Sequence, residues 1–266
     1  MNRRPPPASA RPRASTRATP LAPRHGLART LSKLGVCSRT EAARWIGEGR
    51  VQVDGHIVRD PEFPIAQSAD AAQRLRVDGQ PLQGPARYYL MLNKPRGLVT
   101  TARDEQGRDT VYRCFDGAGL PWLAPVGRLD KASEGLLLFS NDPQWAAAVT
   151  DPDRGPDKTY HVQVDCRPDA VQLQALRDGV RDEGEWLSAR RIEVLREGER
   201  NAWLEVVLEE GRNRQIRRLL ATQSMGVLRL VRVAIGELQL GELAKGAWRP
   251  LSEAERRALV PEAERR

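Results

Sequence analysis

The sequence predicts an α+β fold in which a domain built on a large mixed sheet follows a small module of helices and short strands. Three observations support this prediction. The chain has 266 residues, enough for about two domains at roughly 150 residues each. Residues 87 to 253 alternate helix-like and strand-like segments in irregular order, which is typical of α+β domains. No repeat of fixed period appears, so a repeat architecture is not expected.

The composition excludes several classes of protein. The densest apolar run is only 136–139, far short of the roughly 20 residues of a membrane-spanning helix, so no membrane partner is expected. The N-terminus is rich in Arg and Pro and lacks the apolar segment of a secretory signal. The three cysteines are far apart and odd in number, which excludes a disulfide scaffold and favours the reducing cytoplasm. The three histidines are scattered too, so no metal site is expected.

Residues 1–24 form a basic N-terminal tail. They contain six arginines, six prolines and no acidic residue, and so carry +6 of the net charge of +8. High charge, high proline content and few large apolar residues predict disorder. The tail is either a solubilising extension or an arm that adds nonspecific affinity for RNA. The remaining chain carries only +2, so nucleic-acid binding there must come from local patches.

Residues 25–84 are predicted to form the small module. Leucines at helical spacing over 27–34 predict a first helix that Gly35 ends. Ser38 and Glu41 match a capping box, which predicts a second helix up to two glycines. The strands that follow are predicted over 51–53, 57–58 and 75–77, with Asp-Gly turns at 54–55 and 78–79.

Basic side chains surround the two predicted helices of this module. They are Arg29, Lys33, Arg39, Arg44 and Arg50, with Glu41 and Glu48 interleaved. This face is either an ordinary solvated helix surface or a surface that grips RNA phosphates.

A Gln-Gly-Pro sequence at 83–85 is predicted to link the module to the second domain, 87–253. Strands are predicted over 87–92, 136–139, 158–164, 192–195, 203–208 and 227–233. Helices are predicted from Asn141 or Asp142 to Val149, over 169–178, and over 213–223. In the second of these helices, Val171, Leu173 and Leu176 are expected to face partly inward. Residues 254–266 are predicted to be a charged C-terminal tail.

The most informative segment is Gly127-Arg128-Leu129-Asp130, directly before a very apolar strand. A carboxylate at the edge of a sheet combines rigid support with access for a ligand. From spacing alone, Asp130 either forms a local ion pair with Arg128 or serves as a functional carboxylate, and the ion pair is the more ordinary outcome.

Two further segments carry candidate functional residues. On a strand, Lys158 and Tyr160 share a face, where a tyrosine is a core or rim residue or a catalyst. The run 210–220 places four arginines at a strand-to-helix junction: 212, 214, 217 and 218. They form either a solvated helix face or a phosphate site with one inward arginine that neutralises a buried carboxylate.

Together these segments resemble a known family. GRLDKASEGLLLFSND, KTYHVQV and EGRNRQIRRLL are similar to the three hallmark motifs of the RsuA-like pseudouridine synthases, and LNKPRGLVTT at 92–101 fits the first strand and loop of their catalytic domain. The run LARTLSKLGVCSRTEAARWIGEGRVQVDGHIV resembles the alpha-L RNA-binding module named after small-subunit ribosomal protein S four. The resemblance covers roughly residues 25–250 and implies a mainly antiparallel catalytic sheet.

The resemblance implies that the chain isomerises a uridine of ribosomal RNA to pseudouridine without metal or organic cofactor. The implied partner is ribosomal RNA or a ribosomal assembly intermediate, with 23S slightly favoured over 16S RNA, and a monomer is the default expectation. Asp130 is implied as the catalytic carboxylate, Tyr160 as the tyrosine that stacks on the target base, and Arg217 as the partner of Asp130. The implied RNA contacts are Arg128, Lys158, Arg212 and Arg214 in the catalytic domain, and Arg29, Lys33, Arg39 and Arg44 in the module.

The alternative is a noncatalytic RNA-binding ribosome-assembly factor on the same fold. Intact Asp130, Tyr160 and Arg217 argue against it, because a purely binding protein has no need of a carboxylate in a cationic cleft. An unrelated carboxylate hydrolase acting on nucleic acid is disfavoured as well, since the sequence near Asp130 lacks the usual acid pair or metal-binding carboxylate cluster.

Overall fold

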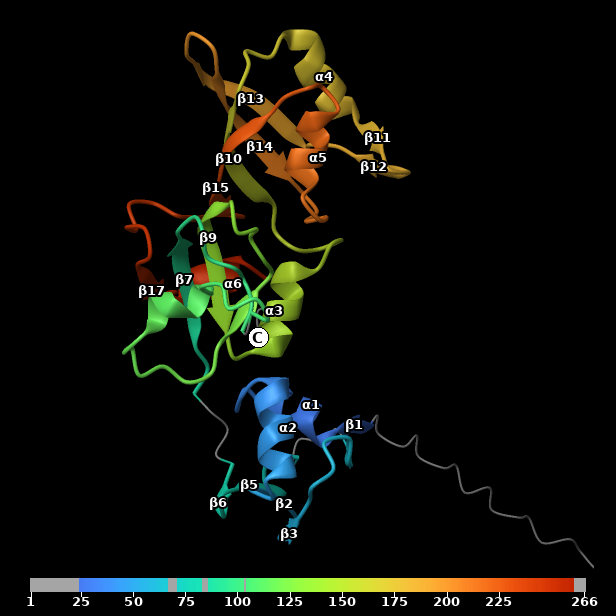
Figure 1. The fold of residues 1–266 in the computed structure, drawn as a ribbon, viewed down its shortest axis with the longest axis vertical. Helices are drawn as coiled ribbons and strands as arrows, with labels where there is room; N and C mark the ends of the chain where they lie inside the picture. The colour runs from blue at the N-terminus through green and yellow to red at the C-terminus, as the bar shows by residue number, and fades with distance from the viewer. Residues whose placement is uncertain (1–23, 67–70, 83–85, 103, 261–266) are drawn as a thin grey trace, which may run out of the picture.

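The computed structural model describes residues 24–66, 71–82, 86–102 and 104–260. Of the basic tail predicted over 1–24, residues 1–23 lie outside these residues and Arg24 belongs to β1. The linker at 83–85 and the last residues 261–266 also lie outside them. Figure 1 shows a small N-terminal module and a larger body built on a long sheet. The module consists of β1 (Arg24–Gly26), α1 (Leu27–Lys33), α2 (Arg39–Gly47), β2 (Val51–Val53), β3 (His56–Ile57), β4 (Pro64–Ala66), β5 (Leu75–Val77) and β6 (Gln80–Pro81).

The predicted helices and turns of the module are confirmed. Gly35 follows α1 with a φ of +74°, the left-handed conformation that ends many helices. The Ser38 side chain caps α2 by accepting a hydrogen bond of 3.1 Å from the backbone N–H of Glu41. Both Asp-Gly pairs, 54–55 and 78–79, have positive φ angles, which fits the tight turns between short antiparallel strands.

The body is built on a mixed, mainly antiparallel sheet, as the sequence predicts. Its main path within the described residues runs β13-β14-β10-β15-β9-β7-β17, with β16 paired to β15 and β8 paired to β9. Among the strands that the structure describes in this sheet, β15 and β9 are the one parallel pair. The strands are β7 (Tyr89–Lys94), β8 (Ala124–Val126), β9 (Glu134–Ser140), β10 (Lys158–Val164), β13 (Arg191–Glu197), β14 (Ala202–Leu208), β15 (Val227–Ile235), β16 (Leu238–Gln239) and β17 (Trp248–Pro250).

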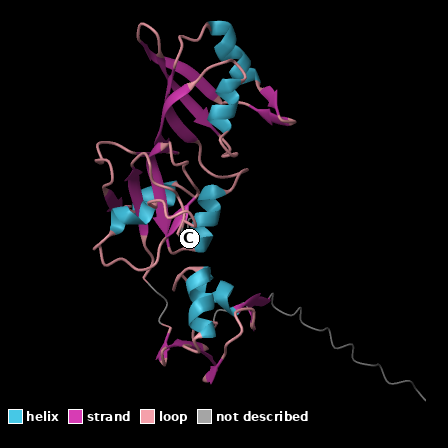
Figure 2. Cartoon of the chain, in the orientation of Figure 1, coloured by secondary structure: helices cyan, strands magenta, loops and turns pink. Residues whose placement is uncertain are grey.

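Helices lie on both sides of this sheet (Figure 2). The buried side chains of the body form two hydrophobic cores. The apolar run in β9 serves both cores, because successive side chains of a strand point to opposite faces. Leu137 and Phe139 belong to the core that includes residues of α4 and α5, whereas Leu136 and Leu138 belong to the core under α3. The elements are η1 (Val111–Phe115), α3 (Pro143–Thr150), α4 (Ala170–Asp178), β11 (Val180–Asp182), β12 (Glu185–Leu187), α5 (Gln215–Ala221) and α6 (Glu253–Ala258).

Several expectations need correction. The strand expected over 87–92 is β7, shifted two residues along the chain to end at Lys94. Val171 is 78% exposed rather than inward, because it lies two residues, about 200° around the helix, from the buried Leu173. Residues expected in a charged tail form α6, and Leu259 and Val260 after it are buried in the core under α3.

Candidate active site

A cleft of about 490 Å³ opens where the loop before β9, strands β10 and β15 and the start of α5 meet. All seven candidate residues predicted in the catalytic domain line this cleft, although they come from three separate segments of the chain. They are Arg128, Asp130, Lys158, Tyr160, Arg212, Arg214 and Arg217. Long-range strand pairing therefore brings the three sequence motifs to one place.

Hydrogen bonds from the segment after β7 hold the loop that carries Asp130. The Thr100 hydroxyl donates to the carbonyl of Leu129 over 2.7 Å and lies 3.4 Å from the Leu129 N–H, so it can also accept from it. The backbone N–H of Ser133 donates to the Asp130 carbonyl over 3.0 Å, which closes a tight turn. The Asp130 side chain is thus mounted on a fixed backbone while 38% of it stays exposed to the cleft.

Lys94 supports the same loop from inside the protein. Its side chain is fully buried, and Nζ donates to the carbonyl of Ser133 over 2.8 Å and to that of Pro95 over 3.1 Å. Burial lowers the pKa of Lys94 from 10.5 to about 8, because the charged form loses its hydration.

Asp130 faces two arginines of the EGRNRQIRR segment. Its Oδ2 lies 3.9 Å from Nη1 of Arg214 and 4.0 Å from Nε of Arg217. Arg217 is held on its other side by a bond of 3.4 Å from Nη1 to the carbonyl of Val227. Burial, followed by the nearby charge of Arg214, lowers the pKa of Arg217, while Asp130 acts in the opposite direction.

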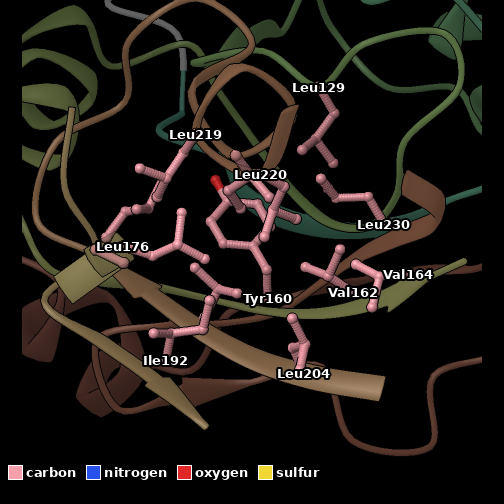
Figure 3. Close-up of a cluster of buried hydrophobic side chains, with 14 of the residues drawn as sticks. Leu129, Tyr160, Val162, Val164, Leu176, Ile192, Leu204, Leu219, Leu220 and Leu230 are labelled. Atoms are coloured by element: carbon pink, nitrogen blue, oxygen red, sulfur yellow. The ribbon is translucent and has the colours of Figure 1, made fainter. Parts of the chain in front are cut away.

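The ring of Tyr160 lies among leucine side chains on the inner face of β10. Figure 3 shows it in one cluster with Leu220 of α5, Leu230 of β15 and Leu129 of the Asp130 loop. Tyr160 is 8% exposed and still lines the cleft. It therefore combines the packing of a core residue with a position at the cleft.

Gly135 makes the parallel contact between β9 and β15 possible. It has a φ of +101°, and an added Cβ would collide with the backbone carbonyl of Arg232. The glycine at this place in GRLDKASEG is therefore a requirement of the backbone.

The cleft is cationic. Six basic and two acidic side chains line it, the acids being Asp130 and Glu210, and Glu210 is paired with Arg212 at 2.8 Å. Burial lowers the pKa of Lys158, and the charge of Arg232 lowers it further against a weaker effect of Asp157. Arg218 points elsewhere, since it pairs with Asp182 and Glu185 of the β11–β12 hairpin at 2.5 Å each.

The predicted RNA-binding residues of the N-terminal module lie on α1 and α2 and do not line the cleft. Arg44 forms ion pairs with Glu41 at 2.5 Å and with Glu48 at 3.9 Å. Lys33 Nζ lies 2.8 Å from the His25 ring. Arg29 and Arg39 are exposed, and no carboxylate among the described residues lies within 4.0 Å of either.

Three residues of the site are missing from the sequence-based set: Lys94, Thr100 and Arg232. Lysine and threonine after a strand are common surface residues, so neither carries a local signal. Arg232 does carry one, because it occupies the inward register of β15 between Leu230 and Ala234, where an apolar residue is the rule.

Two negative findings apply to the described part of the chain. No group of three His, Cys, Asp or Glu side chains there could hold a metal ion. No helix among the same residues is long and apolar enough to cross a membrane.

Comparison with known proteins gives consistent matches. The model for RNA pseudouridylate synthase matches residues 88–222, and the S4 domain model matches 26–70. The chain is 34% identical over 227 residues to an uncharacterized RNA pseudouridine synthase of Aquifex aeolicus, covering 85% of this chain and 89% of the relative. It is 35% identical over 238 residues to ribosomal large subunit pseudouridine synthase B of Pasteurella multocida, covering 86% and 67%. A crystal structure of a pseudouridylate synthase, 28% identical, superposes with a TM-score of 0.60 over 89% of this chain and 100% of the other.

Proposed function

We infer that this chain, which belongs to the RNA pseudouridylate synthase family, isomerises a uridine of ribosomal RNA to pseudouridine, with large-subunit RNA slightly favoured. Membership of the family makes it an isomerase that acts on RNA, and the resemblance to RsuA-like synthases with an S4 domain is confirmed. The ribosomal substrate rests on the names of the relatives from Pasteurella multocida and Haemophilus influenzae. One observation carries the catalytic assignment: the Asp130 carboxylate lies in a cationic cleft with Tyr160 and Arg217.

Asp130 is proposed to act on the sugar of the target nucleotide. When the bond between N1 of uracil and C1′ of ribose breaks, the electron pair stays on the base and positive charge develops on the sugar. The carboxylate either attacks C1′ as a nucleophile or removes the C2′ proton to give a glycal. Both routes need an ionised, oriented carboxylate, which the turn closed by Ser133 and the charges of Arg214 and Arg217 would supply.

Tyr160 is proposed to hold the detached base. Its ring would stack on the uracil while the base turns and C5 bonds to C1′. The oxygen of Tyr160 is a candidate to receive the C5 proton while the hydroxyl's own proton passes to solvent, from which N1 is protonated. N1 gains a proton as C5 loses one, so the isomerisation balances without any redox change.

The remaining basic residues are proposed to bind the RNA backbone. Arg128, Arg212 and Arg214 are exposed at the cleft and Lys158 is half-buried there, so they are placed to contact phosphates around a flipped nucleotide. Flipping a base costs a few kcal/mol, which these contacts would offset. In the N-terminal module, which we take as the domain over 25–84, the RNA-binding side chains are proposed to be Arg29, Lys33, Arg39 and Arg44.

The catalytic domain is proposed to extend from residue 87 past the expected limit of 253, because Leu259 and Val260, which follow α6, are buried in its core. The enzyme is expected to work as a monomer in the cytoplasm, where a ribosomal substrate would be found.

The decisive experiment is pseudouridine mapping of RNA from cells with and without the gene. One defined uridine of ribosomal RNA should lose its modification in the deletion and regain it with the wild-type gene. Asp130→Asn should fail to restore it. If no ribosomal position changes, the ribosomal substrate is wrong, and if Asp130→Asn restores the modification, the catalytic role of Asp130 is wrong.

Asp130→Asn is a clean variant because the side chain is partly exposed and its two ion pairs are long. We expect the purified variant to keep the wild-type melting temperature and RNA affinity.

A further inference from the structure

Arg232 is a buried arginine on the floor of the cleft for which the reaction described above has no role. It is 6% exposed and lines the cleft from the inward face of β15. Its Nε donates to the carbonyl of Leu136 over 2.7 Å, which ties β15 to β9. Its Nη2 is buried and has no hydrogen-bond partner among the described residues.

An unpaired buried nitrogen on a charged group is costly, on the order of 1–3 kcal/mol or more. A structural tie to Leu136 needs only one N–H of the five that a guanidinium carries. A glutamine or lysine could supply that single bond without bringing an unpaired guanidinium donor into the interior. The excess donors of Arg232 therefore point to a ligand that is present only when substrate is bound.

The neighbours of Arg232 define what kind of ligand fits. Tyr160 lies directly opposite Arg232 in the pairing of β10 and β15, so the two side chains share the face that lines the cleft. Lys158 lies on the same face and is close enough for Arg232 to oppose its charge. Two cations side by side with a free donor fit an oxygen that carries negative charge.

RNA has two sources of such an oxygen, the phosphates and the target base. The burial of Arg232 distinguishes between them. Phosphates stay with the backbone at the mouth of a cleft, where the exposed Arg128, Arg212 and Arg214 lie. A flipped base enters the pocket and stacks on its floor. Arg232 and Tyr160 are both more than nine-tenths buried, so they are placed to meet the base.

We propose, resting on the proposed isomerisation, that Arg232 donates hydrogen bonds to a carbonyl oxygen of the target uracil and stabilises the charge on the departing base. As N1–C1′ breaks, the electron pair left on N1 is shared with O2 and O4 of the ring. A guanidinium at one of these oxygens binds the detached, negatively charged base more strongly than the neutral base of the substrate. Such an interaction raises the rate of cleavage with little effect on RNA affinity.

The test compares the wild-type enzyme with Arg232→Gln and Arg232→Lys on total RNA labelled with [5-³H]uridine, taken from cells lacking the gene. Tritium release under single-turnover conditions reports loss of the C5 proton from whichever RNA is the substrate. Dissociation constants for the same RNA are measured at several salt concentrations. Arg196→Gln is the matched control, because Arg196 is an exposed strand arginine over the Trp203 ring and does not line the cleft.

We expect Arg232→Gln to slow tritium release at saturating enzyme by about 100-fold, the reduction typical of removing one donor to a developing oxyanion. RNA affinity and its salt dependence should stay at the values of the wild type and of Arg196→Gln. If Arg232→Gln does not fold, as judged by its melting curve, Arg232→Lys decides. Lysine keeps the charge but cannot place donors at the separate positions of Nε and Nη2 of the guanidinium, so the rate should fall by about 10-fold or more.

Unchanged release by a folded variant overturns the proposal. Weaker RNA binding with a reduced salt slope and an unchanged saturated rate also overturns it, because that result identifies a phosphate contact. If the wild-type enzyme itself releases no tritium, the proposed isomerisation is wrong, and the role proposed for Arg232 is wrong as well. The wild-type arm thus separates the two failures.

Discussion

Nε of Arg217 lies 4.0 Å from Oδ2 of Asp130 and is buried without a hydrogen-bond partner among the described residues. The two groups therefore face each other without forming a direct hydrogen bond in this structure. Catalytic hydrogen bonds are often long in free enzymes and shorten when substrate binds. A small movement of the Asp130 carboxylate would satisfy the buried donor, so substrate binding and assembly of the pair are expected to occur together.

The first prediction concerns this pair. Arg217→Lys should lower the saturated single-turnover rate by about 100-fold, because an ammonium group cannot reproduce the fixed geometry of the guanidinium beside the carboxylate. Arg218→Lys is the control on the same helix, since Arg218 pairs with Asp182 and Glu185 away from the cleft. Tritium release and RNA affinity are measured for both. Equal rates for the two variants would show that Arg217 is not needed beside Asp130.

The sequence indicates the residues that line the cleft better than it indicates the residues that hold the Asp130 loop in place. Lys158 to Val164 is found as β10 with the predicted boundaries, because its alternation is local. Asp130, Tyr160 and Arg217 meet in the cleft as the resemblance implies. Lys94 and Thr100 act on a loop some 30 to 40 residues away along the chain, and no local pattern encodes such a contact. Long-range hydrogen bonds of this kind become visible only once strands are paired.

The second prediction concerns Thr100 as a positioning residue for Asp130. Thr100→Val keeps the shape of the buried side chain but removes the bond to the Leu129 carbonyl, so the Asp130 loop should gain freedom. We expect the saturated rate to fall by about 10-fold, while RNA affinity stays unchanged. Thr100→Ser retains the hydroxyl and should restore most of the rate. A merely structural role would instead lower the melting temperature in Thr100→Val without changing the rate of the folded enzyme.

The third prediction uses the buried Lys94 and the pH dependence of stability. Its pKa is about 8 in the folded chain, against 10.5 for the ordinary side chain. Between these values the unfolded state binds more protons than the folded state, so this group makes stability rise with pH in that window. At pH below 8 both states are protonated, and the folded state bears the full cost of the buried charge.

Comparison with Lys94→Met isolates this effect. Between pH 8 and 10.5, the free energy of unfolding of the wild type should rise relative to that of the variant by up to about 3 kcal/mol. This figure follows from about 1.4 kcal/mol for each unit of pKa shift. Urea unfolding of both proteins at several pH values measures the difference. A constant difference across this range would mean that Lys94 titrates at its ordinary pKa in the folded chain.

The fourth prediction concerns the N-terminal module, where Arg29 and Arg39 are exposed and free of carboxylate partners within 4.0 Å among the described residues. Free arginines can take phosphates without first breaking an ion pair, so they should contribute more to RNA binding than Arg44, which Glu41 and Glu48 occupy. The double variant Arg29→Gln/Arg39→Gln should therefore weaken binding of total RNA from cells lacking the gene. The slope of log affinity against log salt should become shallower by roughly 0.7 to 0.9 for each phosphate that the variant no longer neutralises.

The matched control for the fourth prediction removes the same charge elsewhere in the module. Arg74→Gln/Arg76→Gln lies on the strand side, where Arg74 is paired with Asp54 at 2.5 Å, and should leave the slope near the wild-type value. Because the module does not line the cleft, both double variants should keep the wild-type single-turnover rate once RNA is saturating. An equal drop in affinity in the two variants would mean that net charge, rather than the face of α1 and α2, governs RNA binding. A lower rate at saturation in Arg29→Gln/Arg39→Gln alone would instead place these helices in the assembly of the active complex.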